Sequence, residues 1–217
     1  MDEIVNRLSR LDACAVSDAL DKLSLKGVVT GIHRVSTERR ISGRVLTVKL
    51  AVADGTTTPR HLTTAAVEAA MPGDIIVIEQ RTGIDAAGWG GTLSLGATVR
   101  GIAGVIVEGP ARDIDECRKC DFPVFARDHT SRTARGRVME IGTNVPISVG
   151  DVSVFAGDYV VADGSAVVFI SQADIRRVLD AAEGIVQREE WMAEKLHSGT
   201  PISEVMGASY ENMLKKK

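Results

Sequence analysis

A short apolar run followed by small residues and a charged pair constrains this chain more than any other feature. Residues 105–107 (Val-Ile-Val) predict a buried strand. Residues 108–111 (Glu-Gly-Pro-Ala) place Gly next to Pro, which is typical of a sharp turn. This turn would present Arg112 and Asp113 at the carboxyl end of the strand. Because α/β proteins commonly bind ligands at the carboxyl ends of their strands, we expect a functional site here.

The charged pair supports two interpretations. The planar guanidinium of Arg112 matches a carboxylate, and Asp113 offers hard oxygen atoms for a divalent cation. Alternatively, the two residues form an ion pair that only ties down a loop. The pair taken alone does not decide between them.

Size and composition are those of an ordinary globular protein, and 217 residues suit one domain. The net charge of −3, without a basic stripe, argues against nucleic acid as a partner. No apolar run is long enough for a transmembrane helix, and the N-terminus lacks the pattern of a signal peptide. We therefore expect a cytoplasmic protein with no membrane partner.

The cysteines predict no disulfide framework, because there are three of them. Cys117 and Cys120 form a C-x-x-C pair, but a zinc site would need a second pair and only Cys14 remains. A thioredoxin-like motif would open a helix after a strand, whereas this pair falls inside an expected helix. We expect these cysteines to be structural.

Hydrophobic periodicity predicts an α/β order of elements. A helical region at 2–23 is expected to contain a second helix capped by Ser17. Expected strands are residues 43–50, 75–79, 105–107 and 122–126, a hairpin-rich section from 149, and two strands joined by Asp163-Gly164. Further expected helices are 61–70, 92–100, 114–120, 172–198 and a short one within 203–213.

The chain is thus expected to form an α/β domain over residues 1–171 and a helical C-terminal arm over residues 172–217. Trp191 and Met192 stand on an otherwise charged helix of this arm. We expect them to pack on a neighbouring subunit.

Several stretches together resemble the RraA-like family, which includes the 4-hydroxy-4-methyl-2-oxoglutarate / 4-carboxy-4-hydroxy-2-oxoadipate aldolases. The matching stretches, in order, are VSDAL (16–20), GRVLTV (43–48), PGDIIV (72–77), WGG (89–91), RGIAGVIVEGPARD (100–113), FPVFAR (122–127) and GDYVVADG (157–164). The resemblance implies a swivelling β/β/α-type fold and a homotrimer or hexamer. It also implies class II pyruvate aldolase chemistry, which depends on a divalent metal.

The resemblance also implies roles for single residues. Arg112 would hold the carboxylate and keto oxygen of a pyruvyl group, and Asp113 would bind Mg²⁺ or Mn²⁺. The backbone N–H groups of Thr92 and Leu93, after Gly91, resemble the pyruvate-carboxylate cradle of the family. In the aldolases, a Glu from the C-terminal helix of a neighbouring subunit lies near the metal.

Glu189 or Glu190 could supply that carboxylate, through water. A departure from the family pattern concerns Gly91, because the aldolases carry an Asp 21 positions before the Arg. That Asp is thought to orient the water that protonates the enolate. We therefore expect weak or undetectable retro-aldol activity, with slow decarboxylation of oxaloacetate still measurable. Gly91→Asp should raise retro-aldol turnover, provided that φ at this position is negative and the position tolerates a Cβ atom. Asp85, in the same loop, is another candidate for the missing group.

Other polar residues have weaker claims to function. Asp18 matches a family position, although an Asp near a helix start is commonly a cap. Several His and Arg side chains could meet a distal carboxylate of the substrate, although each alone is more typical of solvated surface. These residues are His61, Arg127, His129, Arg132 and Arg135.

The leading hypothesis is a divalent-metal-dependent carbon–carbon lyase that acts on small 2-keto di- or tricarboxylates. It would release pyruvate by retro-aldol cleavage or by decarboxylation of oxaloacetate. The alternative is a non-catalytic RraA-like binding or regulatory protein that acts through protein–protein contacts.

Overall fold

The strands of the computed structural model, which describes residues 3–55 and 60–207, form one large sheet and a separate hairpin. The sheet contains β1 (Val28–Val29), β2 (His33–Arg34), β3 (Ile41–Val52), β4 (Ile75–Glu79), β5 (Gly104–Ala111), β6 (Val124–His129), β7 (Val138–Thr143), β10 (Tyr159–Ala162) and β11 (Val167–Ile170). The hairpin consists of β8 (Ile147–Val149) and β9 (Val152–Val154). The helices are α1 (Glu3–Leu8), α2 (Ala13–Leu23), α3 (Thr64–Ala69), α4 (Gly91–Val99), α5 (Ile114–Lys119), α6 (Ile175–His197) and α7 (Ile202–Val205).

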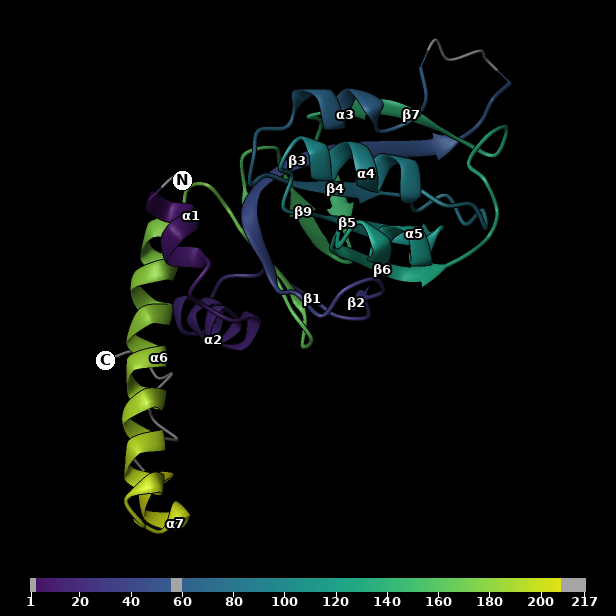
Figure 1. Ribbon diagram of the computed structural model, residues 1–217. Coiled ribbons are helices and arrows are strands. Elements are labelled where there is room, and N and C mark those ends of the chain that lie inside the picture. The colour runs from purple at the N-terminus through teal and green to yellow at the C-terminus, as the bar shows by residue number, and fades with distance from the viewer. Residues whose placement is uncertain (1–2, 56–59, 208–217) are drawn as a thin grey trace.

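The sheet is mixed, with the order β1-β11-β10-β3-β4-β5-β6-β2, and β7 also pairs with β3. The central strands β3, β4, β5 and β6 run parallel. The 12-residue β3 pairs with β10 through its first residues and with β4 and β7 farther along. It therefore joins the two parts of a curled sheet (Figure 1). The expected mixed α/β domain with a C-terminal helix is confirmed.

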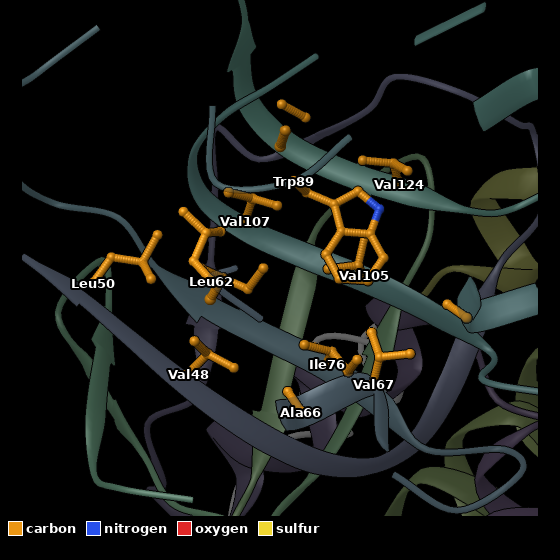
Figure 2. Packing of buried hydrophobic residues seen from close by; sticks show 14 of the residues in the cluster. Val48, Leu50, Leu62, Ala66, Val67, Ile76, Trp89, Val105, Val107 and Val124 are labelled. Carbon is orange, nitrogen blue, oxygen red and sulfur yellow. The ribbon is translucent and has the colours of Figure 1, made fainter. Parts of the chain in front are cut away.

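The parallel strands bury both faces, because neighbouring residues alternate between two apolar clusters. Ile76 and Ile78 of β4 face the cluster that α3, α4 and α5 cover, whereas Ile75 and Val77 face the inside of the curl. The β8–β9 hairpin contributes to the second cluster. Figure 2 shows the first cluster, in which Trp89 lies among side chains of the strands.

A third apolar cluster joins α1, α2 and α6 to β10 and β11. Leu8, Val16 and Leu179 are fully buried in it. Arg7 of α1 adds ion pairs to Asp180 (2.6 Å) and Glu183 (2.7 Å) of α6. These helices lie to one side of the body formed by the parallel strands (Figure 1).

Local structure departs from the sequence expectations at several points. Asp12, not Ser17, caps α2, and its side chain accepts a hydrogen bond from Ala15 N. Residues 108–111 continue β5 instead of turning, because β6 pairs with Pro110 and Ala111 after a register shift. The short strands β1 and β2 and the strand β7 were not predicted. The short expected helix at 203–213 begins at Ile202 as α7, and residues 208–213 lie outside the described residues.

The long α6 confirms the expected C-terminal helix and extends beyond α2 (Figure 1). Met192 is buried within this single chain, whereas Trp191 is 49% exposed. Packing of Trp191 on a second subunit, and a division of the chain after residue 171, stay predictions. In the part of the chain that the structure describes, no helix has the length and apolarity to span a bilayer.

Candidate active site

The candidate site lies where β4 and β5 end, at the same edge of the parallel sheet. The segment after β4 returns along the end of β5: Gly88 N donates to Pro110 O (2.9 Å), and Arg112 N donates to Trp89 O (3.0 Å). Trp89 also forms an isolated parallel bridge with Ala111. These backbone bonds bring the start of α4 next to Arg112 and Asp113.

Asp113 has an uncommon backbone conformation, with φ 55° and ψ 43°, in the left-handed region that Asp tolerates better than most residues. It is the N-cap residue of α5, but its side chain makes no capping hydrogen bond there. Instead, Asp113 Oδ2 accepts from Gly91 N (3.2 Å) and from Arg112 Nε (3.1 Å). Among the described residues, Oδ1 has no hydrogen-bond partner, so this oxygen remains free to bind a ligand.

The two glycines before α4 permit this close packing. A Cβ atom at Gly90 would lie 2.9 Å from Asp113 Oδ2. A Cβ atom at Gly91 would lie 2.7 Å from Glu116 Cβ, at the base of a side chain on α5. The room that the Gly91→Asp expectation requires is therefore absent, although Gly91 itself begins an ordinary α-helix.

The N-terminus of α4 faces the same site. The N–H groups of Thr92 and Leu93 belong to the first turn of a helix, so they have no acceptor within the helix. Such groups attract anions. Arg112 and Asp113 are each about one third exposed, at 35% and 36%, which leaves them accessible to a ligand.

A buried polar network that no sequence pattern indicates supports the turn before α4. Trp89 Nε1 donates to Ser94 Oγ (2.8 Å), and Ser94 Oγ lies 3.1 Å from Cys117 Sγ. The Trp89 ring stacks on Phe122, with ring centroids 5.8 Å apart. Burial raises the pKa of the Cys117 thiol, which disfavours the reactive thiolate. Cys117 is a buried free thiol, and its burial supports a structural role.

A pocket of about 400 Å³ collects these groups, a size suited to a small organic ligand. Arg112, Asp113, Gly90, Thr92 and Leu93 line it together with Trp89, and loop residues complete the wall. Gly91 contributes through its contact with Asp113 and is not itself a lining residue.

The pocket separates the loop candidates into two groups. His61 and Arg135 line it. Arg127 instead pairs with Glu108 (2.9 Å), and Arg132 pairs with Asp85 (3.3 Å). His129 lies beside Asp128, outside the lining. Asp85 does not line the pocket either, so the structure offers no support for it as a replacement acid.

Two further candidates lie away from the pocket within this chain. Glu189 approaches Asp12 and Asp18, and burial together with these carboxylates raises its pKa. Burial likewise raises the pKa of Asp18. Neither Glu189 nor Glu190 lines the pocket of its own chain. Their approach to the pocket of a neighbouring subunit stays a prediction.

A preformed metal cage is absent from residues 3–55 and 60–207, where no three His, Cys, Asp or Glu side chains could hold an ion. The donor set still fits one kind of cation. Mg²⁺ is usually held by one or two carboxylates, several waters and oxygen atoms of the substrate. Asp113 lines the ligand-sized pocket, and its Oδ1 has no hydrogen-bond partner among the described residues, so it can supply that carboxylate.

Comparisons with known proteins identify the family and the fold of the chain. The RraA-like family model, described as Aldolase/RraA, matches residues 13–169. A putative 4-hydroxy-4-methyl-2-oxoglutarate aldolase from Halalkalibacterium halodurans is 31% identical over 182 residues, covering 83% of this chain and 82% of that protein. Protein DlpA of Legionella pneumophila is 25% identical over 94% of this chain, which spans only 33% of DlpA.

The fold is also found in a solved structure. Streptomyces coelicolor RraAS2, described as an unusual member of the RNase ES inhibitor RraA protein family, superimposes with a TM-score of 0.82. The alignment covers 90% of this chain and 98% of RraAS2, at 22% identity. This likeness shows a shared fold.

Proposed function

Because the chain belongs to the RraA-like family, we propose that it is a divalent-metal-dependent carbon–carbon lyase acting on small 2-keto di- or tricarboxylates. The observation that carries the proposal is the convergence of Arg112, Asp113 and the N-terminus of α4 in one ligand-sized pocket. A relative named as a putative aldolase, 31% identical over most of both chains, supports the same class of reaction.

The chain's own groups suit a 2-keto acid. Asp113 Oδ2 holds Arg112 by its Nε, so the two terminal nitrogens of the guanidinium remain for a carboxylate and keto oxygen. The N–H groups of Thr92 and Leu93 offer a second anion contact. Breaking the bond next to the keto group leaves an enolate of pyruvate, and fixed positive charge beside its oxygen lowers the barrier.

Asp113 Oδ1 would hold Mg²⁺ or Mn²⁺ together with substrate and water oxygens. The metal would act as a Lewis acid on the carboxylate and keto oxygens. Gly91 has no side chain, so this position supplies no carboxylate to orient the water that protonates the enolate. Decarboxylation of oxaloacetate needs no base for a substrate hydroxyl, unlike retro-aldol cleavage, so we propose that decarboxylation is the faster reaction.

The test measures pyruvate formation from oxaloacetate with Mg²⁺ or Mn²⁺, and with a chelator. We expect metal-dependent turnover by the wild type and a melting temperature that oxalate raises only when metal is present. Asp113→Asn keeps the side-chain volume and should lose both effects. A wild type that neither turns over oxaloacetate nor responds to oxalate would contradict the proposal. It would favour a binding protein, which has no need of this pocket.

A further inference from the structure

The pocket needs a group that can give up a proton, because the enolate of the proposed reaction becomes pyruvate only when its carbon is protonated. Gly91 has no side chain to help, and Asp85 does not line the pocket. A proton donor from the described part of the chain must therefore be one of the ionisable side chains in the lining. These are His61, Arg112, Asp113 and Arg135.

The chemistry of the four side chains leaves one donor. A guanidinium does not release its proton in a protein, which excludes Arg112 and Arg135. Asp113 accepts two hydrogen bonds at Oδ2, and the proposed function assigns its Oδ1 to the metal. Imidazole, in contrast, both gains and loses a proton near neutral pH. His61 is thus the side chain of the lining that can transfer a proton.

The turn that carries His61 is fixed to the body of the molecule. Leu62 is buried in the apolar cluster of Figure 2, and Thr63 N donates to Glu140 Oε2 of β7 (2.6 Å). His61 O accepts from Thr64 Oγ1 (2.7 Å) at the start of α3. These contacts hold the backbone of His61 in place at the pocket wall.

The contact of the imidazole ring with Leu62 determines which nitrogen can react. His61 Nδ1 lies 2.9 Å from Leu62 O, and a carbonyl oxygen can only accept, so Nδ1 carries a proton. Nε2 is then the nitrogen whose protonation changes: it donates when the ring is positive and accepts when the ring is neutral. His61 is also exposed, so water can return the proton after each turnover.

We propose that His61 is a catalytic acid whose Nε2 protonates the carbon of the enolate. The inference rests on the proposed function, which forms that enolate beside Arg112. In this step the Nε2–H bond breaks, and the electron pair of the enolate C=C bond forms a C–H bond at the future methyl carbon. An oxygen lone pair restores the keto C=O bond, and Nε2 keeps the electron pair of the broken bond. The neutral ring then takes a proton from water.

The reverse of this step can be measured without breaking a C–C bond. In D₂O, removal and return of a methyl proton replace the hydrogens of pyruvate by deuterium, and ¹H NMR follows the loss of the methyl signal. With Mg²⁺ present, we expect the wild type to catalyse this exchange. His61→Gln should lower the maximal exchange rate by about 100-fold, as general acid–base catalysis typically contributes at least that much. The pyruvate concentration that gives half-maximal exchange should not change.

His129→Gln is the matched control, because it removes an imidazole that lies beside Asp128, outside the pocket lining. It should exchange pyruvate at the wild-type rate. A second measurement separates proton transfer from binding. The rise in melting temperature that oxalate and Mg²⁺ produce together should be the same in the wild type and both variants, since the proposed contacts of oxalate are with Arg112 and the metal at Asp113.

The inference is overturned if the wild type does not exchange pyruvate, or if His61→Gln exchanges it at the wild-type rate. It is also overturned if His61→Gln loses the effect of oxalate, because His61 would then support the pocket without moving a proton. Turnover of oxaloacetate, measured separately, tests the proposed function. Exchange that depends on His61 without such turnover would overturn only the proposed function.

Discussion

The pocket edge of the sheet and the helical region of α1, α2 and α6 are held together by different interactions. At the pocket, backbone hydrogen bonds and glycine contacts hold polar groups in place, as at Gly88, Gly90 and Gly91. In the helical region, an apolar cluster containing Leu8 and Leu179 supplies most of the contact, with ion pairs at its surface. The difference implies that substitutions of the exposed pocket side chains alter function, whereas substitutions of buried residues in the helical region alter stability.

Arg112→Ala should have the largest effect of the substitutions considered. This effect should fall on catalysis and not on stability. Loss of a preorganised positive group at the enolate should lower kcat/KM for oxaloacetate by about 1000-fold, roughly 4 kcal/mol. Arg112 is 35% exposed, so the urea midpoint should hardly move. Arg112→Lys should recover little, because an ammonium cannot make the paired contact. Near-normal turnover in Arg112→Ala would break the assignment of the pocket.

Leu179→Ala, in contrast, should lower stability and leave activity unchanged. Leu179 is fully buried between α6 and its neighbours, so the substitution should cost about 3 kcal/mol of unfolding free energy. Oxaloacetate turnover by the remaining folded protein should be unchanged. The measurements are urea denaturation and active-site-normalised kinetics. A loss of turnover equal to that of Arg112→Ala would show that the two regions are coupled.

A pair of glycine substitutions sharpens the comparison. Gly91→Asp places its Cβ 2.7 Å from Glu116 Cβ and should lower stability by about 2 kcal/mol. It should leave retro-aldol turnover no higher than in the wild type. Gly184→Ala, on α6, meets nothing within 4 Å and should raise stability by about 0.5 kcal/mol. Faster aldol cleavage by Gly91→Asp would mean that α5 moves aside.

The smallest effect concerns the ion pairs between α1 and α6. The hydrogen bond from Arg7 lowers the pKa of Glu183 below its ordinary 4.5. A carboxyl whose pKa falls on folding adds stability above its unfolded pKa and loses it as the pH drops. Glu183 is 37% exposed, so Glu183→Gln should cost less than about 1 kcal/mol at pH 7. In urea denaturation, this difference should shrink below about pH 4.5.

Sequence alone predicted the elements whose pattern is local. The apolar run of β4 and the amphipathic α6 were recognised because their own residues determine them. The end of β5 was predicted as a turn because Gly and Pro usually mark one. Residues 108–111 stay extended because β6 and the segment at Trp89 pair with them, which no local pattern reveals.

The same distinction applies to the site. Arg112 and Asp113 could be found because they are adjacent and follow a strand. The contact of Gly91 with Glu116, and the Ser94 support beneath Trp89, depend on how α4 meets α5. Sequence could not separate Arg135 from Arg132, because the path of one loop decides which of them reaches the pocket.

The pairing of β1 with β11 has a consequence for the order in which the chain can fold. Val28 lies opposite Val168, and Arg7 meets Glu183. During synthesis from the N-terminus, α2 cannot pack its apolar face and β1 cannot pair until residues beyond 168 have been synthesised. Contacts so distant in sequence slow folding and leave apolar surface uncovered in the meantime. The parallel strands from β3 to β6 pair over shorter distances, so the ligand pocket can form before the helices that close the molecule are in place.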